Sequence, residues 1–275
     1  MAKTVDLHSH THYSDGAHAP AELVRRAHAA GIDVLSITDH DSVDAWDEAV
    51  EAGRSVGMEI VPGVELSATL GRKDVHILGY MFDPHNREFR DILTLLKRER
   101  RLRAERIVEK LHTLKLPLSF DSVLAYAGFG AIGRPHIAAA LVDNGYTTTY
   151  AEAFVTLIGD SCPAFEPKYR IAPEHAVEMI ANAGGVSILA HPGWSLTEDE
   201  LLQLIRAGID GIEVVHPAHD ESRRAYYRGI TSTYFLLETG GSDFHGGKRD
   251  DDANLGTYTV TNAAVDAMKR RLFIQ

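Results

Sequence analysis

The chain has 275 residues, 44% of them hydrophobic, which is enough to bury one large α/β core or a core that carries an inserted domain. Its 39 acidic and 28 basic residues give a formal charge of −11, which argues against binding to long duplex nucleic acid, because such proteins need an extended basic surface. The single cysteine, Cys162, excludes an intrachain disulfide and a thiolate-rich metal site.

Short apolar runs rich in β-branched residues alternate with helix-like segments along most of the chain. The expected strands are TVDL, DVLSIT, EIVPGV, DVHILGY, GVSILA, GIEVV and YFLLET. Helices are expected over residues 20–30 and 173–183, each followed by glycine, and after Thr197, which forms a capping box with Glu200. This alternation predicts βα units around a parallel sheet or barrel.

Between about Tyr80 and Phe165 the pattern changes from strands to helices. Residues 88–113 predict one long helix that Pro117 closes, and shorter helical pieces follow without a strand-like run. We therefore expect a discontinuous α/β barrel over residues 1–82 and 166–275. A helical insertion over residues 83–165 would lie over the barrel as a cap.

Side chains that bind metals follow nearly every predicted strand. The candidates are His8, His10, Asp15, His40, Glu65, His76, His191, Asp243 and His245. In α/β barrels the C-terminal ends of the strands build the site from residues far apart in sequence. Glu65, expected directly after a turn at 61–64, has two oxygens that can bridge two ions. Nine nitrogen and oxygen ligands are too many for one ion and suit two or three.

The remaining histidines do not share this pattern, apart from His216 after the GIEVV strand. We expect the following to be surface or capping residues: His12, His18, His28, His85, His112, His175 and His219.

Five segments, HSHTHYSDG, SITDHDS, VPGVELS, AHPG and GGSDFHG, resemble the motifs of the PHP (polymerase and histidinol phosphatase) family. The resemblance implies a distorted (β/α)7 PHP barrel that carries a di- or trinuclear metal site. By motif, one ion would be held by His8, His10, Glu65 and Asp243, a second by Glu65, His76 and His191, and a third by Asp15, His40 and His245. A ligand set without thiolate suits Mn²⁺, Fe²⁺ or Zn²⁺, and we expect three ions of Mn²⁺.

Such an ion cluster indicates hydrolysis of a phosphate ester. Ions about 3.5–4 Å apart lower the pKa of a bridging water and clamp the oxygens of an in-line displacement, so metal-activated hydroxide is the expected nucleophile. Asp15 and His40 would act in catalysis through the third ion. His216, at a strand end outside the ligand set, is the candidate for protonating the leaving oxygen.

The insertion contains cations for an anionic substrate. Arginines at 100, 103 and 106 lie near one face of the expected long helix, although most of them also have acidic neighbours. GRPHIA places Arg134 and His136 at a helix N-terminus, which favours anions. GRPHIA, a Pro-Lys pair and LAHPG resemble one PHP branch, which contains 3',5'-nucleotide bisphosphate phosphatases and 5'→3' exoribonucleases of the RNase AM type. The candidate substrate-binding residues are Arg103, Arg134, His136 and Lys168.

The expected activity is removal of the 3'-phosphate from nucleoside 3',5'-bisphosphates, which gives the nucleoside 5'-monophosphate. Four alternatives stay open: trimming of RNA 5' ends by the same site, histidinol-phosphate hydrolysis, deaminase or amide-hydrolase chemistry, and a metal-binding structural module. The expected partner is a nucleotide or a short RNA. With no apolar leader and no run of 18 apolar residues, we expect a cytoplasmic protein that does not engage a membrane.

Overall fold

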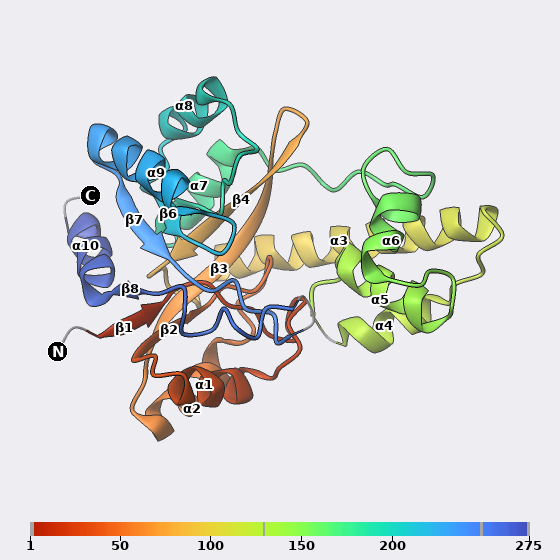
Figure 1. Ribbon diagram of the computed structural model, residues 1–275, viewed down its shortest axis with the longest axis horizontal. Helices are drawn as coiled ribbons and strands as arrows, with labels where there is room; N and C mark the ends of the chain where they lie inside the picture. Colours follow the sequence, from red (N-terminus) through yellow and green to blue (C-terminus); the bar gives the residue numbers. More distant parts are fainter. Residues whose placement is uncertain (1–2, 129, 248–249, 274–275) are drawn as a thin grey trace.

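The computed structural model describes residues 3–128, 130–247 and 250–273, and joins the predicted strands in one curved sheet. The strands are β1 Thr4–Asp6, β2 Val34–Ile37, β3 Glu59–Leu70, β4 Lys73–Tyr80, β5 Val186–Leu189, β6 Gly211–Val215, β7 Leu237–Gly240 and β8 Val260–Thr261. Among the described residues their order is β7-β6-β5-β4-β3-β2-β1-β8. The segments after β1 and β7 also pair, since the N–H of His10 donates to Phe244 O at 2.9 Å and the N–H of Asp243 donates to His8 O at 2.9 Å. The sheet therefore nearly closes into the distorted barrel that the sequence predicts (Figure 1).

The barrel is not uniformly parallel. β4 runs antiparallel to both β3 and β5, because only Gly71 and Arg72 separate it from β3, and a parallel crossover needs a dozen or more residues. The short β8, which the sequence analysis did not predict, runs antiparallel to β1. The predicted barrel is confirmed, but the prediction of a parallel sheet is wrong for β4 and β8.

The expected turn at residues 61–64 is also wrong. Pro62 and Gly63 lie within β3, where Pro62 pairs with Ile37 of β2. A side chain at position 63 would come within 2.1 Å of Ser36 Oγ, so only glycine lets the two strands approach this closely. Glu65 consequently lies inside a continuous strand and not at the end of one.

Helices cover the outside of the barrel and build the cap (Figure 1). They are α1 Pro20–Ala29, α2 Trp46–Val56, α3 Arg87–Thr113, α4 Phe120–Ala127, α5 Arg134–Asp143, α6 Tyr150–Ala153, α7 Pro173–Asn182, α8 Glu198–Arg206, α9 Glu221–Tyr234 and α10 Asn262–Leu272, with a π-helical segment at Phe154–Ile158. The predicted capping box is present at the start of α8, where the Thr197 side chain accepts from the N–H of Glu200. Within the described residues, no helix combines the length and the apolar character needed to cross a bilayer.

The long helix α3 joins two hydrophobic cores. Its first half contributes Phe89 and Leu93 to the core between the barrel and its outer helices. Its second half contributes Ile107 and Leu111 to a separate core formed with α4, α5 and the segments that follow them. Because one continuous helix enters both cores, it fixes the cap relative to the ends of the barrel strands (Figure 1).

Candidate metal centre and phosphate-binding cavity

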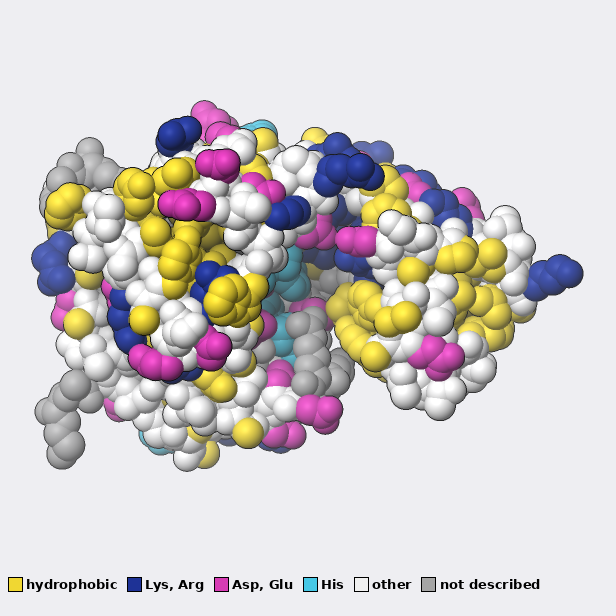
Figure 2. All heavy atoms as spheres, turned by 45° about the horizontal axis from the view of Figure 1, so that its top comes forward, with side chains coloured by type: hydrophobic (Ala, Val, Ile, Leu, Met, Phe, Trp, Pro, Cys, Tyr) yellow, Lys and Arg dark blue, Asp and Glu magenta, His cyan; other side chains and the backbone are white. Residues whose placement is uncertain are grey.

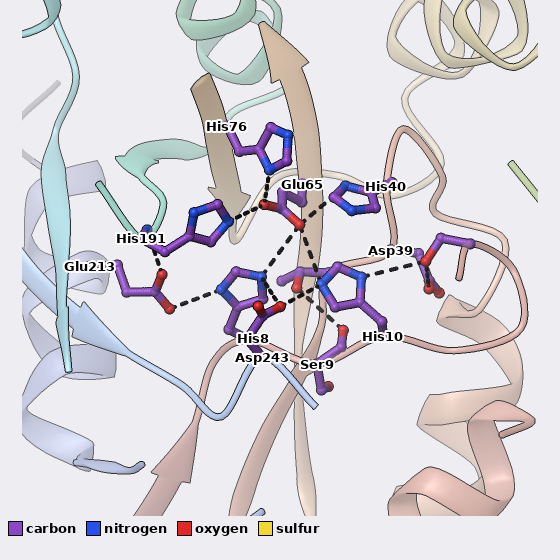
Figure 3. A network of polar contacts seen from close by, with 12 residues as sticks. His8, Ser9, His10, Asp39, His40, Glu65, His76, His191, Glu213 and Asp243 are labelled. Atoms are coloured by element: carbon purple, nitrogen blue, oxygen red, sulfur yellow. Dashed lines mark hydrogen bonds and ion pairs between the residues drawn. The ribbon is translucent and has the colours of Figure 1, made fainter. Parts of the chain in front are cut away.

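The structure brings all nine predicted metal-binding residues together at one end of the barrel. Groups of three or four that offer nitrogen or oxygen atoms close enough to share an ion include His8–His10–Asp243, His8–Glu65–His191, His40–Glu65–His76 and His10–Asp15–His40–His245. These groups overlap through shared histidines and Glu65, so they form one continuous cluster. The side chains come from the segments after β1, β2, β5 and β7 and from β3 and β4 themselves (Figure 3).

Glu65 lies at the centre of this cluster (Figure 3). Its Oε1 lies 2.7 Å from His76 Nδ1 and 2.9 Å from His191 Nε2. Its Oε2 lies 3.4, 3.3 and 3.2 Å from ring nitrogens of His8, His10 and His40. Burial by itself would raise the pKa of Glu65, but His40, His76 and His8 hold that pKa well below its usual value. The carboxylate is therefore an anion with both oxygens facing imidazoles, as a bridging metal ligand requires.

The contacts around several ring nitrogens have the spacing of ligands on a common ion. His10 Nε2, His40 Nδ1 and His245 Nε2 are buried and make no hydrogen bond to the described residues. Their nearest carboxylate oxygens lie at 3.2, 3.2 and 3.4 Å, on Asp243, Glu65 and Asp15 respectively. Two ligand atoms bound at about 2.1 Å to one ion at a tetrahedral angle lie about 3.4 Å apart. The donor set therefore fits divalent ions.

Burial and charge around the cluster favour a bound cation. Although burial disfavours imidazolium, the carboxylates of Glu213, Asp243 and Glu65 raise the pKa of His8 well above its usual value. Burial, by contrast, lowers the pKa of His40 well below its usual value. An arrangement of buried carboxylates and imidazoles with such opposed shifts is common at functional sites.

Three buried acids that the sequence analysis did not select support the candidate ligands. Glu213 of β6 lies with Oε1 2.9 Å from His8 Nδ1, and its Oε2 accepts from the backbone N–H of His191 at 2.8 Å. Asp39 accepts from the backbone N–H and hydroxyl of Thr11, and so fixes the loop after His10. Asp6 accepts from the backbone N–H groups of His8 and Ser242, which joins the ends of β1 and β7. Their only sequence signal is an acid within a predicted strand or just before a histidine, which many unrelated proteins share.

His216 faces the same cluster. It is buried, with Nε2 3.4 Å from Asp243 Oδ2, and its Nδ1 accepts from the backbone N–H of Ala218 at 3.0 Å. An imidazole whose Nδ1 accepts a hydrogen bond carries its proton on Nε2 when neutral. Nε2 is therefore the atom of His216 that can donate a proton toward the centre of the site.

Strained backbone accompanies the site. His191 has φ +24° and Asp243 has φ +50°, values that L-residues rarely adopt. His191 lies two residues after the end of β5 and Asp243 three residues after the end of β7, where the chain turns away from the barrel while these side chains point toward the cluster (Figure 3). Strain of this kind persists where the surrounding structure enforces it, and it is concentrated at functional sites.

A cavity of about 610 Å³ connects the cluster to the cap. Its lining contains three of the candidate ligands, Asp15, His40 and His76. It also contains four cations and two aromatic rings: Arg100, Arg103, Arg134, Lys168, Tyr150 and Phe154. Figure 2 shows histidine side chains at the bottom of the hollow between the barrel and the cap. The structure thus places three of the four candidate substrate-binding residues, Arg103, Arg134 and Lys168, in one cavity with the cluster.

The cavity cations are crowded together and have some acidic partners within the protein. Arg134 pairs with Asp160 at 2.7 Å, and Arg100 pairs with Asp41 at 2.6 Å. Arg134 and Lys168 share Asp74, at 3.8 and 3.1 Å. Arg103 donates to the backbone oxygen of Glu166 at 2.8 Å, and burial, together with the positive charges of Arg134 and Arg100, lowers its pKa to about 10. Burial likewise lowers the pKa of Lys168. Crowded, partly desolvated cations of this kind favour an anionic ligand.

Two predicted positions have different surroundings from those expected. His136 is buried and does not line the cavity; its Nδ1 accepts from the backbone N–H of Gly133 and caps α5. His219, expected at the surface or at a cap, is buried behind the site, with Nδ1 3.0 Å from Val214 O and Nε2 accepting from the N–H of Gly193 at 3.0 Å. The surface assignment of His219 is therefore wrong, because the loop after β6 folds back under the loop after β5.

Comparisons with known proteins agree with this geometry. The PHP domain model matches residues 6–183. Over 250 residues the chain is 34% identical to a 5'-3' exoribonuclease of Haemophilus influenzae, covering 89% of this chain and 91% of that protein. It is 32% identical over 247 residues to a 3',5'-nucleoside bisphosphate phosphatase of Chromobacterium violaceum, covering 88% and 87%. A crystal structure from Bifidobacterium adolescentis, assigned as a metal-dependent phosphoesterase, superposes with a TM-score of 0.90 at 32% identity over 98% of this chain and 97% of that one.

Proposed function

Because this chain belongs to the PHP domain family and is a metal-dependent phosphoesterase, we propose that its substrate is a 5'-phosphorylated nucleotide whose 3'-phosphate it hydrolyses. The simplest such substrate is a nucleoside 3',5'-bisphosphate. Water attacks the 3'-phosphorus, the bond from phosphorus to O3' breaks, and O3' takes up a proton. The products are inorganic phosphate and the nucleoside 5'-monophosphate.

One observation carries this proposal: a single cavity is lined both by candidate metal ligands and by several cations. The candidate metal cluster at Asp15, His40 and His76 would hold the reacting phosphate. The cations Arg103, Arg134 and Lys168, on the cap side, would hold the second phosphate. A substrate with two phosphates separated by a ribose matches this arrangement better than a simple monoester does.

The chain's own residues have separate roles in this scheme. Divalent ions held by the nine candidate ligands would supply Lewis acidity to the attacking water and to the phosphoryl oxygens. Glu213 fixes the tautomer of His8 by accepting from Nδ1, which leaves Nε2 free to face the cluster. His216 holds a proton on Nε2 beside Asp243, and we assign it to the leaving O3'. The rings of Phe154 and Tyr150 are tilted against each other with centroids 5.2 Å apart, and they would form the apolar side of the nucleoside pocket.

A second candidate function is exonucleolytic removal of the first nucleotide of a 5'-phosphorylated RNA. The same bond from phosphorus to O3' breaks, and the products are a nucleoside 5'-monophosphate and an RNA shortened by one residue. The hollow between barrel and cap opens to solvent (Figure 2), so a longer chain can leave it, and a relative of this length is named as a 5'-3' exoribonuclease.

The two substrates can be compared directly. Protein loaded with Mn²⁺ is assayed for phosphate release from adenosine 3',5'-bisphosphate and for mononucleotide release from a 5'-phosphorylated tetraribonucleotide. Turnover of the bisphosphate supports the first proposal, and turnover of the oligonucleotide alone supports the second. Hydrolysis of neither substrate by the fully loaded protein would contradict both.

A further inference from the structure

An exposed tryptophan stands at the rim of the site, outside the cap-side cavity. Trp194 lies on the loop between β5 and α8, only three residues after the candidate ligand His191, so their Cα atoms are at most about 11 Å apart. Its exposed fraction is 69%, which is high for the largest side chain. In Figure 1, α8 and α9 lie on the side of the barrel away from the cap helices.

A buried arginine covers one face of this indole. The guanidinium carbon of Arg223, on α9, lies 3.3 Å from the Trp194 ring centroid. Arg223 is only 7% exposed, and its Nε makes no hydrogen bond to the described residues. Among those residues no carboxylate lies within ion-pair distance of its guanidinium, so the positive charge beside the indole is not neutralised by a described carboxylate.

The loop that carries Trp194 is rigidly attached to the site. Gly193 donates its N–H to His219 Nε2 at 3.0 Å, and its carbonyl accepts from the Tyr227 hydroxyl at 3.0 Å. The rings of His191, His216, His219 and Tyr227 follow one another at centroid spacings of 5.2, 5.6 and 5.3 Å. The backbone beside Trp194 is therefore anchored to residues around the candidate metal centre, while most of the tryptophan side chain is exposed.

We infer that Trp194 and Arg223 form a stacking platform for the second nucleotide of a single-stranded RNA, an inference that rests on the second candidate function, exonucleolytic removal of the first nucleotide. The first nucleotide would occupy the cap-side cavity, and the bond to be cut would lie at the metal cluster. The following base would then leave on the side away from the cap and stack on the open face of Trp194. Stacking on aromatic side chains is the usual way in which proteins bind unpaired bases without regard to sequence. The uncompensated charge of Arg223 attracts the phosphates of that segment.

An exposed aromatic residue is by itself ordinary at a protein surface. What distinguishes Trp194 is its combination with an unpaired, nine-tenths buried cation on one face and a doubly hydrogen-bonded glycine beside it. Neither Trp194 nor Arg223 lines the cap-side cavity, so a nucleoside bisphosphate bound in that cavity would not need the platform. The platform therefore acts on RNA and not on mononucleotides.

The selectivity ratio between two substrates tests this. We define it as kcat/KM for a 5'-phosphorylated tetraribonucleotide divided by kcat/KM for adenosine 3',5'-bisphosphate. Trp194→Ala is expected to lower the ratio about 5- to 150-fold, the range that the loss of one base–aromatic stack produces. Trp194→Phe should restore most of it. The control is Tyr234→Ala. Tyr234 is a 41% exposed aromatic residue on the same helix as Arg223, about 16 Å farther along α9 than Arg223. A ratio unchanged in Trp194→Ala, or lowered equally by Tyr234→Ala, overturns the inference.

A binding measurement separates this inference from the proposed function. The chain has two tryptophans, so Trp46→Phe leaves Trp194 as the only one. Its fluorescence should be quenched saturably by a 5'-phosphorylated tetranucleotide with phosphorothioate linkages, and far less by adenosine 3',5'-bisphosphate at the same concentration. Quenching in a protein that hydrolyses neither substrate would reject the proposed function and keep the platform. Absence of quenching in an active protein would reject the platform alone.

Discussion

Glu213 gives the sharpest test of how the barrel supports the candidate metal centre. It is fully buried on β6, and its two oxygens meet two different groups: Oε1 lies 2.9 Å from His8 Nδ1, and Oε2 accepts from the N–H of His191 at 2.8 Å. If His8 binds an ion through Nε2, its Nδ1 carries a proton, so both partners of Glu213 are donors. Glu213→Gln keeps the size of the side chain but leaves one acceptor for two donors.

The magnitude follows from that mismatch. A buried donor without an acceptor costs about 1–3 kcal/mol, and loss of a carboxylate that orients a ligand histidine lowers metal affinity about 10- to 100-fold. We therefore expect Glu213→Gln to bind Mn²⁺ about 10- to 100-fold more weakly, with turnover recovering in part at high Mn²⁺ concentration. The assay is a metal titration of phosphate release, with circular dichroism to verify the fold. Glu59→Gln is the matched control, since Glu59 also lies on a barrel strand but pairs with Lys3 at the surface. Equal Mn²⁺ affinity of Glu213→Gln and the wild type would show that Glu213 does not support the metal centre.

Three further changes have expected outcomes. Asp15→Asn should lower kcat about 100-fold or more with an unchanged circular dichroism spectrum. The reason is that Asp15 is the single carboxylate in its group of candidate ligands, which also contains His10, His40 and His245. Wild-type turnover of Asp15→Asn would exclude Asp15 from the metal centre. Arg134→Ala should raise KM about 10- to 100-fold, the effect of losing a charge-assisted contact of about 1.5–3 kcal/mol. The control is Arg101→Ala, which removes an exposed arginine of α3 and should leave KM unchanged. A KM of Arg134→Ala equal to that of the wild type would leave Arg134 with a structural role. Burial lowers the pKa of Lys168, so as the pH rises toward 10.5 the native state gives up this proton before the unfolded state does. The free energy of unfolding should therefore rise with pH over this range. Denaturation curves of Lys168→Met, measured at several pH values, should lack this rise.

The sequence predicted the site better than it predicted the path of the chain around the site. The candidate metal ligands could be selected because each follows or lies within an apolar run, and because barrel strands bring such positions to one end. The antiparallel β4 could not be found in the same way, because an apolar run has no direction, and only the short connection at Gly71 and Arg72 makes a parallel arrangement impossible.

The supporting residues were missed for a different reason. Glu213 interrupts the apolar run GIEVV, and its importance depends on contacts with His8 and His191, which lie 205 and 22 residues away in the sequence. His219 has no motif of its own, and it is buried only because the loops after β5 and β6 pack together. The role of Trp194 likewise depends on Arg223, a partner from another helix. Contacts between segments that are far apart in the sequence determine the surroundings of all three residues, Glu213, His219 and Trp194.

We expect phosphate hydrolysis to depend on ions held by the nine clustered candidate ligands. The most direct measurement is a titration of metal-free protein with Mn²⁺, in which phosphate release from adenosine 3',5'-bisphosphate and bound metal per chain are followed together. We expect no phosphate release without metal and full activity near three ions per chain, with phosphate release and metal binding lost together in His10→Ala. Full activity in the presence of a strong chelator, or metal uptake that His10→Ala leaves unchanged, would contradict it.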